Sequence, residues 1–218
     1  MAGTDTFFDA HQRGTVEAAM ARIIPTDEQP GAREAGTVDF VDRYLSGIGF
    51  IYARPDGSGF ETLTGRQADA WMTRVQASRD KYVVGITELD RVAEEQHSAA
   101  FVELTEAQQD DVLHRIERPG ADTTKAPEAW TINYGGPVEP ALQQTSSEQD
   151  LDFFGLLVAH TRQGFYADPI YGGNRNRVGW DVIGFPGPSS LAEVHQGRYS
   201  TIDFFADNRE HPGGEPAR

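Results

Sequence analysis

Residues 64–96, TGRQADAWMTRVQASRDKYVVGITELDRVAEEQ, carry the clearest periodic pattern in this 218-residue chain. Apolar or small side chains recur every three or four residues, at Trp71, Val75, Ser78, Tyr82, Ile86, Leu89 and Ala93. This spacing places them on one face of a helix. Thr64 and Gln67 have the spacing of a capping box, so we expect one long amphipathic helix from there to about Gln96. Gly85 inside it indicates a bend or a close contact with another helix.

Three further helices flank this one along the chain. Asp9 with Gln12, and Thr105 with Gln108, repeat the capping-box spacing, and Pro25 ends the first helix because it disfavours helical geometry at the residue before it. The expected ranges of the shorter helices are 9–24, 37–52 and 105–116.

A further helix is expected over 150–165, with Ser146 and Gln149 as its capping pair. It is apolar nearly all round, through Leu151, Phe153, Phe154, Leu156, Leu157 and Val158. A helix of this kind belongs at the centre of a fold. Beyond residue 165 the periodicity stops, and glycine, proline and aromatic residues dominate.

The pattern indicates a mainly α protein, a single irregular helical domain with long loops rich in glycine and proline. We expect an N-terminal arm over 1–8 and the helical domain over 9–195, with a long surface excursion over 118–147. A C-terminal tail follows over 196–218, and its end is expected to be disordered.

The charge balance excludes several classes of partner. Acidic residues number 34 against 19 basic ones, a formal net charge of −15, and there is no cysteine. We therefore expect no nucleic-acid partner, no thiolate metal site and no direct membrane insertion. The acidity is densest over 88–117, where nine acidic residues face two arginines. That stretch is read either as a solvated helix face or as a docking surface for a basic partner.

Catalytic signatures are missing from the sequence. It contains no P-loop, no nucleophile elbow, no dinucleotide fingerprint and no His-Glu-x-x-His motif. Of the six histidines, His160 alone lies in an apolar helix, and the others, at positions 11, 97, 114, 195 and 211, are expected at the surface. His160 is read either as a buried histidine bonded to a loop backbone or as a residue with a role at a partner's site.

The charge reverses between residues 160 and 180. Arg162, Arg175 and Arg177 stand there against Asp168 alone. Arginines set among glycine, asparagine and aromatic residues suit bidentate contacts with carboxylates or backbone oxygens. Two interpretations stay open: a loop that folds back onto the buried helix through internal ion pairs, or an interface.

Residues 166–187, YADPIYGGNRNRVGWDVIGFPG, resemble the C-terminal signature of the gluconate 2-dehydrogenase subunit 3 family. The opening of the chain agrees with that family in order and spacing, through Phe7-Phe8, the stretch RIIPTD over 22–27, PGAREAG over 30–36 and DFVD over 39–42. The middle of the chain resembles it more weakly. The similarity covers residues 7 to 188.

The resemblance implies a non-catalytic small subunit. In that family a separate large subunit of the glucose–methanol–choline oxidoreductase type carries FAD and the catalytic histidine, and a cytochrome subunit accepts electrons in some complexes. The small subunit supports the folding, stability and export of the large one. We therefore expect no cofactor in this chain, and FAD in its partner.

Many members of that family begin with a twin-arginine signal, and none is visible here. As the sequence stands it indicates a cytoplasmic protein, or a periplasmic or membrane-associated one if it is exported together with its partner.

The residues expected to contact the large subunit, or to brace the loop that does, are His160, Arg162, Tyr171, Asn174, Arg175, Arg177 and Trp180. Two alternatives remain beside the subunit role. One is a folding or export chaperone that is not retained in the mature complex. The other is an independent enzyme with His160 as a general base.

Overall fold

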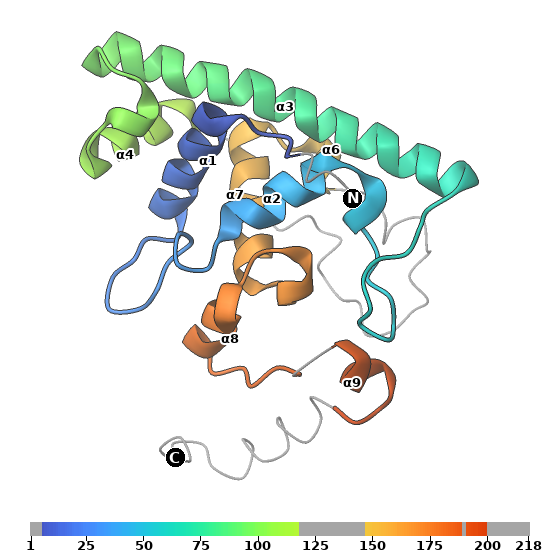
Figure 1. The fold of residues 1–218 in the computed structure, drawn as a ribbon. Coiled ribbons are helices and arrows are strands. Elements are labelled where there is room, and N and C mark those ends of the chain that lie inside the picture. The colour runs from blue at the N-terminus through green and yellow to red at the C-terminus, as the bar shows by residue number, and fades with distance from the viewer. Residues whose placement is uncertain (1–5, 118–146, 189–190, 200–218) are drawn as a thin grey trace, which may run out of the picture.

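The computed structural model describes residues 6–117, 147–188 and 191–199, and within them the chain is mainly α-helical, as the sequence indicates (Figure 1). The predicted excursion over 118–147 falls outside these ranges except for its last residue. The end of the predicted tail also lies outside the described residues. The domain boundaries expected from the sequence stay predictions.

Helix α3 (Gly65–His97, 33 residues) lies across the whole molecule in Figure 1. At a rise of 1.5 Å per residue, it is about 50 Å long. Its buried face includes Val75, Tyr82, Ile86, Leu89 and Ala93, so the predicted stripe is confirmed.

The capping box predicted at the start of α3 is wrong. The Thr64 side chain makes no capping hydrogen bond. Gly65, the first residue of the helix, has a left-handed φ of 59°. A capping box needs helical geometry at the residues directly after the cap, and this glycine turns the chain differently.

The predicted close helix contact at Gly85 is confirmed. A Cβ atom at this position would lie 2.0 Å from the ring of Phe153, at the start of α7 (Phe153–Tyr166). Any larger residue would push the two helices apart. The glycine therefore permits α7 to pack directly against the middle of α3.

Helices α1 (Ala10–Ile23) and α4 (Glu106–Ile116) have the predicted capping boxes. The Gln12 backbone N–H donates to Asp9 Oδ1 (2.8 Å), and the Asp9 N–H donates to Gln12 Oε1 (3.1 Å). The Thr105 N–H likewise donates to Gln108 Oε1 (3.0 Å). The predicted capping boxes at Asp9 and Thr105 are therefore confirmed, and in both cases the residues that follow the cap are helical.

Two helix boundaries differ from the sequence prediction. Helix α2 (Thr37–Ser46) ends earlier than expected, because Gly47 has φ 155° and ψ −179°; a short 3₁₀ turn, η1 (Ile48–Phe50), follows. Helix α7 begins later than expected. Asp152 is its N-cap and accepts from the Gly155 N–H (2.8 Å), whereas α6 (Ser147–Asp150) is a separate turn. Asp152 caps the helix because its carboxylate accepts from the N–H three residues on. Ser146, of the predicted pair, lies outside the described residues.

The core is built around α7, which contacts α1, α2 and α3. Leu156 and Leu157 on α7 are fully buried, which confirms its predicted central position. The N-terminal arm also enters the core. Phe8 is buried, and Asp42 Oδ1 on α2 accepts the backbone N–H groups of both Phe7 and Phe8 at 2.9 Å.

After α7 the chain forms short elements only: η4 (Pro169–Tyr171), η5 (Arg175–Arg177), α8 (Val178–Val182) and α9 (Leu191–His195). Among the described helices, none has the length and apolar character that crossing a membrane requires.

Candidate functional site

Residues 166–187 fold over the C-terminal end of α7, and we call them the signature loop (Figure 1). Its backbone has left-handed φ angles at Gly172 (111°), Asn174 (48°), Asn176 (56°) and Arg177 (63°). For residues other than glycine, this conformation costs about 1–2 kcal/mol each. Such strain persists only where surrounding contacts hold the backbone in place.

Asn174 lies at the centre of the loop and is fully buried. Its Nδ2 donates to the carbonyl oxygen of Ala167 (2.9 Å), and its Oδ1 accepts from the Gly179 N–H (2.8 Å). The amide therefore joins the start of the loop to α8. Asparagine fits here because it offers both a donor and an acceptor, and because it tolerates left-handed geometry better than most residues.

Trp180 on α8 is 6% exposed and forms the second internal brace. Its indole Nε1 donates to the carbonyl oxygen of Tyr166 (2.8 Å) at the end of α7. Phe185 packs edge-on against its ring, with centroids 5.3 Å apart. Gly187 lies directly over the indole, where a Cβ atom would approach to 2.1 Å.

Two glycines let the loop backbone lie directly on the last turn of α7. A Cβ atom at Gly173 would lie 2.1 Å from the carbonyl oxygen of Gly164, and one at Gly179 would lie 1.9 Å from that of Phe165. Backbone atoms cannot move aside as a flexible side chain can. Gly173 and Gly179 are therefore required by packing.

The loop is also tied to α2 and the residues before it. Arg175 donates from its backbone N–H to Ala35 (2.8 Å) and from Nη2 to Asp39 Oδ2 (2.5 Å). Arg43 Nη1 donates to the carbonyl oxygen of Ile170 (2.8 Å). We call these three contacts the clasp. They join residues more than 120 positions apart in the chain.

The remaining predicted loop residues are placed less tightly. The Tyr171 hydroxyl accepts from the Ala53 N–H (3.4 Å), and the guanidinium of Arg177 lies 5.9 Å from the Trp180 ring centre. Arg162 is exposed on α7. The structure thus shows that Tyr171, Asn174, Arg175 and Trp180 make contacts within the chain. A contact with a partner by any of the predicted residues stays a prediction.

His160 is buried in the core, away from the signature loop. Its Nδ1 lies 3.0 Å from the Tyr82 hydroxyl, and the two rings stack with centroids 5.7 Å apart. Within the described residues, the hydrogen-bond partner of Nδ1 is thus a side chain of α3, where the sequence had suggested a loop backbone. Burial lowers the pKa of His160 to about 4, which keeps the imidazole neutral at pH 7.

The other described histidines are mostly at the surface, as predicted. His11, His114 and His195 are exposed, and His211 lies outside the described residues. His97 is the exception: it is half-buried, and its Nε2 is enclosed and has no hydrogen bond within the described residues.

A family model described as gluconate 2-dehydrogenase subunit 3 matches residues 10–187. The chain belongs to this family. No curated protein and no solved structure matches the chain significantly.

The gluconate 2-dehydrogenase subunit 3 match spans both sides of the clasp. It includes Asp39 and Arg43 on α2 as well as Arg175 in the signature loop. The family name also places the chain in a multi-subunit dehydrogenase, which implies a catalytic partner. The clasp therefore joins two parts of the matched range that lie far apart in the chain.

Sequence reasoning missed a groove next to the loop. It has a volume of about 490 Å³ and is lined mainly by aromatic and apolar side chains. The lining residues are Phe40, Tyr44, Phe50, Ile51, Trp71, Arg74, Glu148, Gln163, Tyr166, Ala167 and Tyr171. We call this the aromatic groove. No local motif could reveal it, because its walls come from α2, η1, α3, α6, α7 and η4.

Polar atoms are held in fixed positions along the groove. Trp71 Nε1 donates to the Tyr52 hydroxyl (3.3 Å), and Gln163 Nε2 donates to Glu148 Oε1 (3.0 Å). The Tyr44 hydroxyl is enclosed and has no hydrogen bond within the described residues. Burial, with a smaller contribution from the Glu148 charge, raises the pKa of Tyr44 well above its ordinary value of 10.

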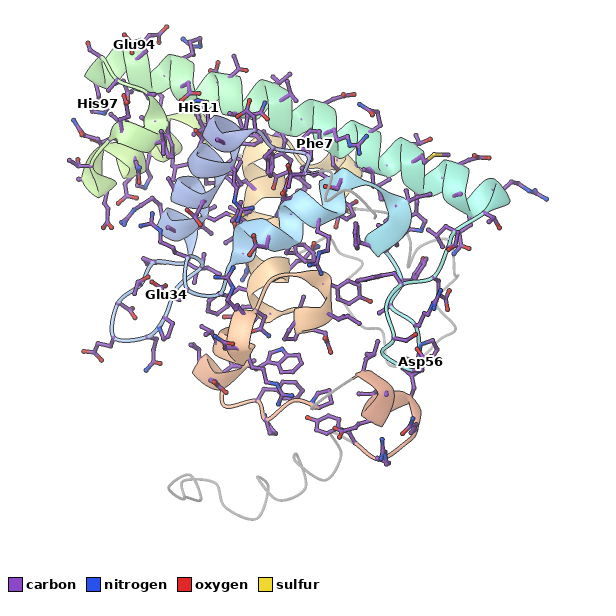
Figure 2. All side chains as sticks on the ribbon, in the orientation of Figure 1. Phe7, His11, Glu34, Asp56, Glu94 and His97 are labelled. Atoms are coloured by element: carbon purple, nitrogen blue, oxygen red, sulfur yellow. The ribbon has the colours of Figure 1, made fainter. Side chains whose placement is uncertain are left out.

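The acidic stretch over 88–117 lies at the other end of α3. Figure 2 shows His11, Glu94 and His97 near that end, far from Asp56. Part of the charge is paired: Asp90 Oδ2 lies 2.7 Å from His11 Nε2, and Asp110 accepts two hydrogen bonds from Arg22. Both interpretations of this stretch stay open. Among the described residues, no group of three histidines or carboxylates is arranged to hold a metal ion.

Proposed function

We propose that this chain is a non-catalytic small subunit. It binds and stabilises a large subunit of the glucose–methanol–choline oxidoreductase type that oxidises a sugar or sugar acid. The observation that carries the proposal is the family match over residues 10–187. The structure adds support, because the most buried residues of the family signature form bonds within the chain. Asn174 and Trp180 use their polar atoms to hold the loop.

The position of His160 supports the same proposal over an independent enzyme. A general base must come within hydrogen-bond reach of the proton that it removes. His160 is 1% exposed, and the rings of Tyr82, Tyr44 and Phe40 surround it. Its role is accounted for by its contact with Tyr82. In our proposal FAD belongs to the partner, and this chain carries no cofactor.

The experiment is co-purification with the large subunit encoded beside this chain. A tagged wild-type chain should retain a yellow protein with flavin absorbance near 450 nm, in a fixed molar ratio. The Arg175→Ala/Trp180→Ala double variant should lose it, because the Asp39 contact of the clasp and the Trp180 brace are both removed. The Val83→Ala variant, which removes a side chain that is 46% exposed on α3, is a surface control that should keep the structure and the binding intact.

Two outcomes would contradict the proposal. One is a wild-type chain that never associates with that flavoprotein. The other is oxidation of a sugar by the purified chain alone with an electron acceptor. Expression of the large subunit with and without this chain separates a retained subunit from a transient chaperone. If the large subunit needs this chain only during synthesis and is afterwards active without it, the chain is a chaperone.

A further inference from the structure

The aromatic groove is bordered by unusually exposed aromatic side chains. Phe50 and Tyr52 are each 38% exposed, and Tyr166 is 41% exposed. Met72, one residue beyond the lining Trp71, is 49% exposed. Tyrosine, tryptophan, phenylalanine, methionine and arginine are the residue types that protein interfaces favour over ordinary surface. A concentration of them at a concave surface marks an interaction site.

Bonds within the chain fix the walls of the groove before any partner arrives. Tyr171 is held by its contact with Ala53 and by the Phe60 ring, whose centroid lies 5.7 Å from its own. Arg43 lies over the Phe50 ring and also bonds Ile170 in the clasp. A surface that is already ordered loses little conformational entropy on binding. The clasp therefore also maintains the shape of the groove.

The polar atoms of the groove indicate what its occupant must offer. Glu148 lines the groove, and its Oε1 accepts from Gln163 Nε2 at an exposed position (3.0 Å). A wholly apolar occupant would bury that carboxylate without further hydrogen bonds, which is unfavourable. The occupant is therefore an apolar surface that also carries at least one hydrogen-bonding side chain.

The charge distribution argues against a second copy of the chain as the occupant. Residues 43–79, which supply five of the eleven residues that line the groove, contain five arginines and three acidic residues, a net charge of +2. Residues 88–117 carry a net charge of −7. Association of two chains of charge −15 is opposed by their mutual repulsion. A different protein with an apolar centre and an acidic rim is complementary to the groove.

We propose that the aromatic groove is where the catalytic subunit docks, with an apolar ridge of that subunit seated between Phe50, Trp71 and Tyr166. The ridge has a hydrogen-bond donor that reaches Glu148, and acidic residues on its rim face the arginines of α3. This inference rests on the proposed function, since it locates the contact that the subunit role requires. The signature loop then supports the interface from behind rather than forming its centre.

The test measures binding of the purified catalytic subunit to immobilised variants of this chain. Tyr166→Ala and Phe50→Ala remove exposed side chains from the groove, so folding should be unaffected. Each should weaken binding at least tenfold, as expected for aromatic residues at the centre of an interface. Val83→Ala, on α3 but outside the groove lining, removes a side chain that is 46% exposed and should change binding less than twofold. Circular dichroism and thermal melting of each variant should match the wild type.

A charge variant tests the rim. Arg66→Glu reverses an exposed charge at the start of α3 and should slow association with the catalytic subunit at low salt. The difference from the wild type should shrink as salt is raised, because screening weakens surface electrostatics.

The outcomes are distinguishable. If the wild type binds and both groove variants bind equally well, the docking site is elsewhere and the inference is overturned. If the wild type does not bind the catalytic subunit at all, the proposed function itself fails. Light scattering provides the third result: a concentration-dependent dimer that Tyr166→Ala abolishes would assign the groove to a second copy and overturn the inference.

Discussion

Replacing Asn174 by alanine should destabilise the protein strongly, and the cost follows from its contacts. The change removes two hydrogen bonds, and leaves the buried Gly179 N–H and the part-buried Ala167 carbonyl without their partner. An unsatisfied buried polar group costs about 1–3 kcal/mol. Alanine in left-handed geometry adds about 1 kcal/mol relative to asparagine. With the lower value for the part-buried Ala167 carbonyl and the full range for the buried Gly179 N–H, the total loss is about 3–5 kcal/mol. This is a large part of the roughly 5–15 kcal/mol that holds a typical domain together.

Thermal melting and urea denaturation measure this loss. For a chain of 150–250 residues, each kcal/mol lowers the melting temperature by about 2–4 °C, so a fall of roughly 6–20 °C is expected. Asn176→Ala is the matched control. It has the same left-handed backbone (φ 56°) but is exposed, so it should cost far less. Asn174→Gly relieves the backbone strain and should be less damaging than alanine by about 1 kcal/mol.

Two results would refute this reasoning. The first is an Asn174→Ala variant within about 0.5 kcal/mol of the wild type, the range expected of an ordinary surface substitution. The second is a glycine variant less stable than the alanine variant, which would show that backbone strain at this position is not what the geometry indicates. Hydrogen exchange at the Gly179 N–H reports directly on the bond that the side chain supplies.

Three further perturbations test other parts of the fold. Gly85→Ala should lower the free energy of unfolding by about 1–3 kcal/mol in urea titrations, because the new Cβ meets the Phe153 ring. Gly14→Ala, whose Cβ has its nearest contact at 3.4 Å, should be neutral or stabilising. Equal effects of the two changes would contradict the close packing of α3 and α7. Asp42→Ala should release the N-terminal arm, which limited proteolysis detects as faster cleavage near Phe7; unchanged cleavage would show that the two N–H bonds do not hold the arm. The pKa of His160 is about 4 in the folded protein and near 6.5 in the unfolded chain. Between these two pH values the unfolded state binds one more proton than the folded state. The free energy of unfolding should therefore fall as the pH drops from 6.5 towards 4. His160→Gln, which does not titrate, should melt with a flatter pH dependence over that window, and an unchanged slope would count against a buried neutral imidazole.

The long helix was predictable because its evidence is local. The stripe from Val75 to Ala93 repeats at helical spacing within one segment, and burial follows from that spacing alone. The capping boxes at Asp9 and Thr105 are equally local, since each pair lies three residues apart. Thr64 shows the limit of such signals, because the left-handed glycine after it was not visible in the spacing.

The signature loop was predictable as a loop, but its partners were not. Arg175 finds Asp39 across 136 residues, and nothing in either neighbourhood specifies that distance in space. The same holds for His160, whose hydroxyl partner Tyr82 belongs to a different helix 78 residues away. The aromatic groove depends on six separate elements, so its existence is a property of the packed molecule.

The clasp has a consequence for the order in which the chain folds. It closes a loop of about 136 residues between Asp39 and Arg175. The part of the closure entropy that depends on loop length amounts to about 4 kcal/mol for a loop of this size. Contacts of this separation form late and slow the folding of the whole domain. During synthesis, α1, α2 and α3 leave the ribosome well before Arg175 does. The nascent chain therefore exposes the surface that later receives α7 and the signature loop until translation has passed residue 180.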